Sequence, residues 1–180
     1  MTFPATARSS KHSGPGSLPG RASLLLRGAC ALLAMWAAPG ATQSNKVQIT
    51  NLSDVAFGSL VNLGVDAVSS QSLCLYSSSA TNGYNVTGQG SGTGNAFTMA
   101  SGLQTLAYDV QWNDSAGQSS GSQLTANTPL TGQISTATHK TCNSGPTNSA
   151  SLIVILRASA FSRATAGTYS GTLTLLIGPE

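Results

Sequence analysis

The sequence predicts an all-β sandwich. Its apolar residues recur in short alternating runs, segments rich in Ser, Thr, Gly and Asn separate those runs, and no stretch shows a sustained 3.6-residue period. Alternation places apolar side chains on one face of a strand, and closely spaced turn residues are typical of stacked antiparallel sheets. We therefore expect two packed sheets in one domain, with a core supplied by the inward faces of the strands.

The start of the chain is typical of a secretory signal. Basic residues occur at Arg8, Lys11, Arg21 and Arg27, followed by the apolar run GACALLAMWAA at 28–38 and the small residues PGATQS at 39–44. The apolar run is too short to span a bilayer, which takes roughly 20 residues. We predict a removable signal region at 1–41, with cleavage after Gly40 or Ala41, rather than a buried core helix. The exported domain is then 42–180, without stable membrane insertion after cleavage.

The charge of the exported part excludes some partners. All five acidic residues follow residue 41, against four basic residues in the same part of the chain. A nearly neutral, sparsely charged domain lacks the basic surface that nucleic acid or an anionic membrane would attract. No nucleic-acid partner is therefore expected.

Two cysteines remain after the predicted cleavage. Cys74 and Cys142 form an even count in an exported chain, which indicates a disulfide. A zinc site would need further ligands, and His139 is the one histidine of the exported part. We predict a structural disulfide worth about 4 kcal/mol and no metal site.

The first strands are predicted from alternation and turn residues. They lie at KVQITNL (46–52), DVAFGSL (54–60), SLCLYS (72–77) and GYNVTGQ (83–89). The dipeptide Asn82-Gly83 between the last two is a strong hairpin signal, so we expect those two strands to pair.

The middle of the chain contains the clearest internal strand. AFTMA (96–100) precedes a turn at Ser101-Gly102, and LQTLAYDVQWN (103–113) then alternates regularly. One predicted face comprises Leu106, Tyr108, Val110 and Trp112, and the other comprises Thr105, Ala107, Asp109 and Gln111. This alternation specifies the register well. A polar loop follows, from Asn113 to Gln123.

The last third of the chain predicts short strands at 123–126 and 130–134. The segment ASLIVILRA (150–158) follows, which is apolar on both faces and is expected to be a central strand.

The final strand also alternates between apolar and polar residues. Its apolar face comprises Tyr169, Gly171, Leu173, Leu175 and Ile177. Edge strands are usually protected by charge, bulge or proline, and only Gly178, Pro179 and Glu180 follow here. We therefore expect this strand to receive a partner strand from another chain.

Catalytic motifs are weak. The segment 117–121 reads GQSSG and matches the G-x-S-x-G pattern, which requires a following helix, an acid and a histidine in that order. After Ser119 there is no aspartate, and the one glutamate is Glu180. The glycines of GQGSGTG (88–94) alternate too regularly for a phosphate cradle, and the four aspartates show no pair suited to glycosidase chemistry. We expect no catalytic centre and no cofactor.

With the strands placed, the chain resembles the spore coat protein U domain family, the pilin-like subunits of archaic chaperone-usher systems. The residues that carry the resemblance are Phe57-Gly58, Cys74, GYNVTGQG, FTMASGLQTLAYDVQW and the ending AGTYSGTLTLL. They are distributed over most of the exported chain, and their order together with the ending carries the resemblance.

The resemblance implies an incomplete immunoglobulin-like sandwich that lacks its last strand. A periplasmic chaperone lends a strand during folding, and another pilin subunit replaces it in the fibre assembled by an outer-membrane usher. It implies export to the periplasm and then the cell surface, with a role in adhesion and biofilm formation. The apolar face of the final strand would border the gap. If residues 42–56 contain the domain's own first strand, little remains to donate, as in a tip or terminating subunit.

Two other functions stay open from the sequence alone. A self-contained secreted module that binds carbohydrate or adheres to a surface would have the same composition, and a hydrolase is the third alternative. A closed sandwich would favour the secreted module, whereas an open edge beside the final strand would favour the pilus subunit.

Overall fold

The computed structural model describes residues 2–3, 5–9 and 45–180. The apolar segment of the predicted signal and both predicted cleavage positions lie outside these residues. Within them, no helix has the length and apolar character needed to cross a membrane.

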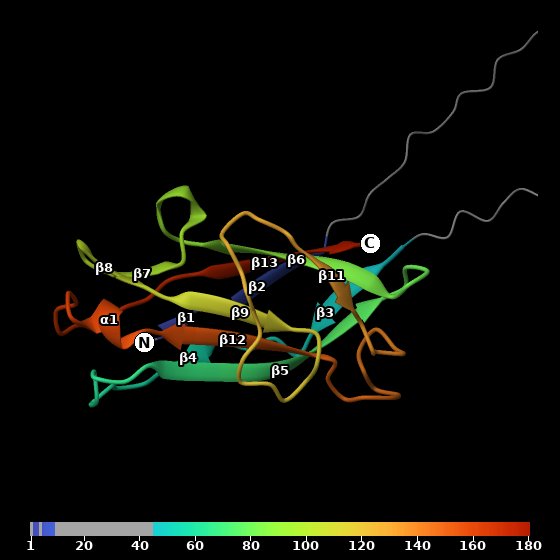
Figure 1. The fold of residues 1–180 in the computed structure, drawn as a ribbon, viewed down its shortest axis with the longest axis horizontal. Coiled ribbons are helices and arrows are strands. Elements are labelled where there is room, and N and C mark those ends of the chain that lie inside the picture. The colour runs from blue at the N-terminus through green and yellow to red at the C-terminus, as the bar shows by residue number, and fades with distance from the viewer. Residues whose placement is uncertain (1, 4, 10–44) are drawn as a thin grey trace, which may run out of the picture. The chain divides into compact units, whose positions relative to one another are not determined.

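The described chain is an all-β sandwich, as predicted (Figure 1). One sheet has the strand order β10 (Ser122–Gln123), β9 (Asp109–Asn113), β12 (Ala150–Leu156), β5 (Ala67–Ser77) and β3 (Val47–Thr50). The other has the order β11 (Leu130–Ile134), β6 (Gly83–Gly90), β13 (Leu173–Pro179) and β2 (Ala5–Ser9). Two small pairs complete the fold, namely β1 (Thr2–Phe3) with β4 (Val55–Ala56), and β7 (Thr98–Ser101) with β8 (Gln104–Ala107).

Strand β12 is central, as its apolar sequence predicts. It pairs with β5 on one side and with β9 on the other, and all seven of its residues are buried. A strand buried on both faces needs apolar residues at successive positions. The run LIVIL meets this requirement and fixes the middle of the larger sheet.

The core joins the two sheets. Trp112 on β9 and Tyr84 on β6 are fully buried, and the indole Nε1 of Trp112 donates a hydrogen bond of 3.0 Å to the Tyr84 hydroxyl. Their rings meet edge to face, with centroids 6.3 Å apart. Burial raises the pKa of the Tyr84 hydroxyl well above its ordinary value, and the hydrogen bond from Trp112 opposes that rise only partly. This pair links the two sheets across the core.

The predicted strand at 103–113 keeps its alternation but is divided in two. Leu106, Tyr108, Val110 and Trp112 are all buried, as predicted. However, β8 pairs with β7, whereas β9 pairs with β12 and β10. The division occurs at Tyr108, whose backbone N–H donates to the Phe97 carbonyl rather than to a ladder partner. The segment thus changes its pairing partner from β7 to β12 and β10, while the same alternate side chains stay on the buried face.

The hairpin predicted at Asn82-Gly83 is wrong. The chain does turn there, and Asn82 has a φ of 55°, but β5 and β6 belong to different sheets and do not pair. The usual hairpin turn requires positive φ at both central residues, and Gly83 is not among the positive-φ glycines. A Cβ at Gly83 would lie 2.8 Å from the Thr81 hydroxyl and 3.3 Å from the Glu180 carbonyl. The glycine therefore permits close packing against the end of the chain.

Two short helical turns were not anticipated, η1 (Thr93–Asn95) and α1 (Ala158–Phe161). Helix α1 follows β12 directly, and its Phe161 is buried in the core. Strand β10 is also shorter than expected, because only Ser122 and Gln123 pair with β9. Strand β4 covers only two residues of the strand predicted at 54–60, β5 begins at Ala67 rather than at Ser72, and β13 begins at Leu173 rather than at Tyr169.

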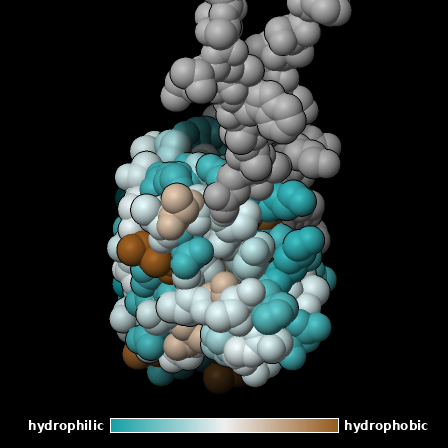
Figure 2. Space-filling view, turned by 90° about the vertical axis from the view of Figure 1, so that its right-hand side faces the viewer, coloured by the Kyte–Doolittle hydropathy of each residue, from teal (hydrophilic) through white to brown (hydrophobic). Residues whose placement is uncertain are grey.

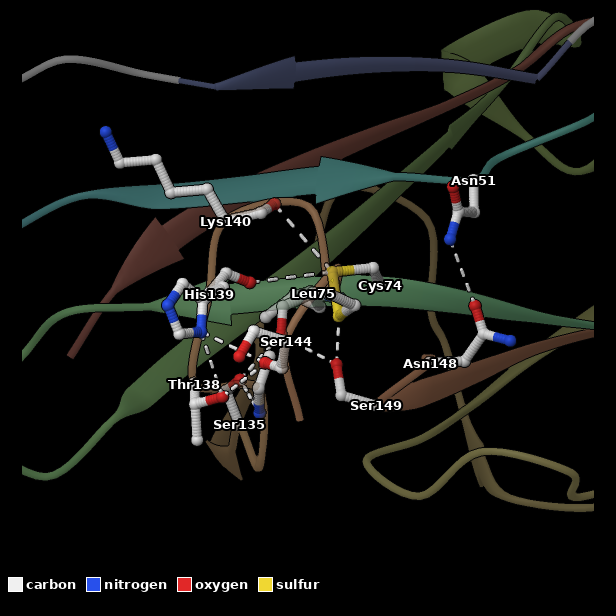
Figure 3. The surroundings of a disulfide bond; sticks show 12 residues. Asn51, Cys74, Leu75, Ser135, Thr138, His139, Lys140, Ser144, Asn148 and Ser149 are labelled. Carbon is white, nitrogen blue, oxygen red and sulfur yellow. Dashed lines mark hydrogen bonds between the residues drawn. A yellow bond between two sulfur atoms is a disulfide. The ribbon is translucent and has the colours of Figure 1, made fainter. Parts of the chain in front are cut away.

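The predicted disulfide between Cys74 and Cys142 is present (Figure 3). Cys74 lies on β5, Cys142 lies in the loop before β12, and their Cα atoms are 5.9 Å apart, a normal separation for a disulfide. Beside it, the hydroxyls of Ser135 and Ser149 both donate to the Leu75 carbonyl, at 2.5 and 2.7 Å. The disulfide and these bonds hold the loop of residues 135–149 against β5.

Candidate strand-acceptor edge

The candidate site is the side of β13 that faces away from β6. On one side β13 pairs antiparallel with β6 from Leu173 to Pro179. On the other side it pairs in parallel with β2, from Leu173 opposite Ala5 to Ile177 opposite Ser9. Figure 1 shows β2 running alongside β13. Strand β2 comes from the region that the sequence predicts to be removed, so residues 45–180 supply β13 with one of its two neighbours.

The apolar face of β13 points into the core as predicted. Leu173, Leu175 and Ile177 are buried, whereas Thr174 and Leu176 between them are half-buried. This is the burial pattern of a strand with one inward face. The inner face is therefore continuous with the hydrophobic core at the border between β13 and β2.

Tyr169 and Gly171 lie ahead of the strand rather than within it. Tyr169 is buried, and its hydroxyl donates to the Thr165 carbonyl at 3.0 Å. Ser170 exchanges two backbone hydrogen bonds with Ala100, of 2.8 and 3.0 Å. A Cβ at Gly171 would lie 3.0 Å from the Thr98 carbonyl. These contacts tie the entry of β13 to the β7–β8 hairpin and hold the strand in place just before its pairing with β2 begins.

A hollow of about 520 Å³ lies next to this entry. One wall is the segment after β4, including Gly58 and Leu60, and the other runs from Phe161 to Tyr169. Within the first segment, Val61 is 96% exposed and Leu63 is 49% exposed. The two residues of β4 pair with β1. The hollow therefore lies near the place where the N-terminal strands leave β13 and reach β4.

The surface at the opposite end of the sandwich is mostly polar (Figure 2). Figure 2 views the end at which β13 finishes, and its visible surface is mostly hydrophilic or neutral, with separate apolar residues rather than a broad apolar patch. Broad exposed apolar patches commonly mark association surfaces.

An ion cluster holds the loop before β5, and no sequence motif predicts this cluster. The guanidinium of Arg157 lies 2.6 Å from the Asp109 carboxylate and 2.8 Å from the Asp66 carboxylate. The Ala158 backbone N–H also donates to Asp66, at 2.8 Å. This backbone bond, together with Arg157, holds the pKa of Asp66 below its ordinary value. The same two carboxylates raise the pKa of Arg157. Folding thus brings two aspartates together around a cation.

The G-x-S-x-G segment forms a surface loop. Ser119 is exposed, and the residues before it are fixed by the Gly117 and Gln118 backbone N–H groups, which donate to the hydroxyls of Ser72 and Ser151. No helix follows the segment, since β10 comes next. Within residues 45–180, no cluster of three or more His, Cys, Asp or Glu side chains is placed to hold a metal ion.

Comparison with protein-family models and with curated proteins gives no match. Among solved structures, the chain is similar to one from a chaperone–tip adhesin complex of CFA/I fimbriae biogenesis, with 14% identity, a TM-score of 0.48 and 76% of this chain covered. It is also similar to one from the CsuC-CsuE chaperone–tip subunit pre-assembly complex of archaic chaperone-usher Csu pili of Acinetobacter baumannii, with 22% identity, a TM-score of 0.39 and 74% covered. The chain spans 41% and 39% of the length of those chains.

Proposed function

We propose that the exported domain is a structural subunit of a chaperone-usher surface fibre that accepts a strand at β13. The supporting observation is the pairing of β13, whose second neighbour is a segment remote in sequence and predicted to be cleaved. Without β2, the backbone groups on that side of Leu173–Ile177 lose their partners while the inner face still belongs to the core. An edge of this kind is completed by β-strand addition.

The donated strand would come first from a periplasmic chaperone and later from another subunit, and an outer-membrane usher would assemble the fibre. The resemblance noted from the sequence supports these partners, as it supports a surface location and roles in adhesion and biofilm formation. The core-bordering face of Leu173, Leu175 and Ile177, with Tyr169 and Gly171 at the strand entry, is the proposed chaperone and donor-strand interface.

We further propose that this subunit accepts a strand without donating one, as a tip or terminating subunit does. Residues 47–50 form β3, which pairs with β5 from Val47 opposite Ser77 to Thr50 opposite Cys74. Val47 is buried, and Ile49 packs against the core. Residues from Val47 onward therefore serve the domain itself. With cleavage after Ala41, only residues 42–46 would remain ahead of β3.

The proposal is tested by producing residues 42–180 in the periplasm with and without a cognate chaperone. Soluble protein should depend on the chaperone and should be recovered as a complex with it. Leu175→Asp should abolish that complex, because an unpaired charge would enter the core border, and Thr174→Asp, on the half-buried face, is the matched control. A soluble, stable monomer without the chaperone would instead support a self-contained secreted adhesive module.

A further inference from the structure

The strand that occupies the β13 edge belongs to the same chain. Its five residues, Ala5 to Ser9, pair with Leu173 to Ile177 without interruption. Just before them, Thr2 pairs with Ala56 and Phe3 with Val55, antiparallel. Strand β2 also lies close to β3, the edge strand of the other sheet. The N-terminal segment therefore covers the border where both sheets would otherwise end.

We propose that residues 2–9 are an intramolecular cap of the acceptor edge, and that removal of the N-terminal region converts a self-completed chain into one that accepts a strand. In the full chain β13 has a neighbour on both sides. Cleavage at the predicted positions, after Gly40 or Ala41, would remove β1 and β2 together and expose the free edge of β13 in one step.

The cap is favoured by its connection to the domain. The sequence ATARS has little intrinsic preference for strand, since alanine is depleted in strands, so the edge must supply most of the stabilisation through backbone hydrogen bonds. Because the segment is tethered, its effective concentration is set by the connecting chain and does not fall when the protein is diluted. A partner strand offered at micromolar concentration would therefore compete poorly until the tether is cut.

The parallel register makes the cap testable by disulfide trapping in the full chain, 1–180, with Cys30→Ser as background. Thr174 lies opposite Thr6, and Leu176 lies opposite Arg8. The in-register variants are Thr6→Cys with Thr174→Cys and Arg8→Cys with Leu176→Cys. Exchanging the partners gives the two controls, Arg8→Cys with Thr174→Cys and Thr6→Cys with Leu176→Cys. Their Cα atoms would be about 8 Å apart, too far for a disulfide.

We expect the in-register pairs to form an intramolecular disulfide at least tenfold more than the exchanged pairs, as measured by peptide mapping of monomeric protein. Equal trapping in all four variants, preferential trapping of the exchanged pairs, no trapping, or trapping only as dimers would overturn the cap. The native disulfide between Cys74 and Cys142, mapped in the same digests, verifies that the domain is folded.

A second measurement needs no new cysteines. Successive N–H groups along a strand point to opposite neighbours, so deleting residues 2–9 should speed hydrogen exchange at alternate amides of β13 while those bonded to β6 stay protected. Unchanged exchange along β13 would also reject the cap. The inference does not rest on the proposed fibre function, because neither measurement involves a chaperone or the shortened domain 42–180. Both can fail while the chaperone dependence of 42–180 holds.

Discussion

At the scale of single residues, Arg157 links parts of the chain that are far apart in sequence. It joins Asp66, just before β5, to Asp109, at the start of β9. All three side chains are about two fifths exposed, so solvent screens their attraction and each ion pair adds little to the free energy of unfolding. The main effect of the cluster is to hold the loop beside the hollow in place. The backbone bond from Ala158 to Asp66 adds a directional restraint.

The lowered pKa of Asp66 predicts a pH-dependent stability. A carboxyl whose folded-state pKa is depressed stabilises the fold above its unfolded pKa, and this contribution disappears as the pH falls through the folded value. Asp66→Asn should therefore reduce the free energy of unfolding at neutral pH, and the difference from wild type should shrink steadily below about pH 4. Urea titrations between pH 2 and 7 would show this, and a difference that stays constant across that range would contradict it.

The disulfide gives a second residue-scale prediction. Its cysteines are 68 residues apart, and closing a loop of that length is expected to stabilise the fold by about 4 kcal/mol. Cys74→Ser combined with Cys142→Ser should lower the urea midpoint accordingly, and reduced wild-type protein should behave like the double variant. If reduction leaves the midpoint unchanged, the bond contributes little to stability.

At the scale of elements, strand positions were predictable where alternation or continuous apolarity is strong. Val110 and Trp112 show the first case, and the fully buried β12 shows the second. Pairing was not predictable at Asn82-Gly83, because the dipeptide signals a turn but does not say whether the next strand stays in the same sheet. The Arg157 cluster depends on contacts across the fold and left no local signal. The apolar face of the acceptor edge was predictable, but its occupant β2 was not, because ATARS carries no strand pattern.

The two faces of β13 should differ in energetic importance. Leu175→Ala should cost about 2–5 kcal/mol in the free energy of unfolding, because Leu175 is fully buried and its removal leaves a cavity. Thr174→Ala, at a half-buried position next to it, should cost less than about 1 kcal/mol. Urea unfolding of the full chain would measure both. Equal costs would mean that the alternation of β13 does not define its core face.

At the scale of the whole molecule, we propose that the domain has no catalytic centre. Ser119 is exposed in a loop that leads into β10 rather than into a helix, so the strained turn on which a nucleophile elbow depends does not form there. Ser119→Ala should therefore leave any esterase activity of a purified preparation, chaperone binding and fibre assembly unchanged. A hydrolytic activity that copurifies with the domain and disappears in Ser119→Ala would refute this.

The completeness of the sandwich predicts how the full and shortened chains differ. In 1–180 the edge of β13 is paired with β2, whereas residues 42–180 would expose it as a template for another strand. Each lost backbone hydrogen bond costs about 0.5–1.5 kcal/mol net. The free energy of unfolding of the shortened chain should therefore be lower by several kcal/mol in total, and its urea midpoint should fall. It should also self-associate as its concentration rises, which analytical ultracentrifugation would measure.

A synthetic peptide with the sequence of residues 1–10 should reverse that self-association, because it can supply the missing strand in trans. The same peptide with proline at the position of Ala7 is the matched control, since proline has no backbone N–H and disrupts strand pairing. The native peptide should return 42–180 to a monomer at peptide concentrations from the high micromolar to the millimolar range, and the proline peptide should not. A shortened chain that stays monomeric and as stable as 1–180 would mean that β13 needs no added strand, and the acceptor model would fail.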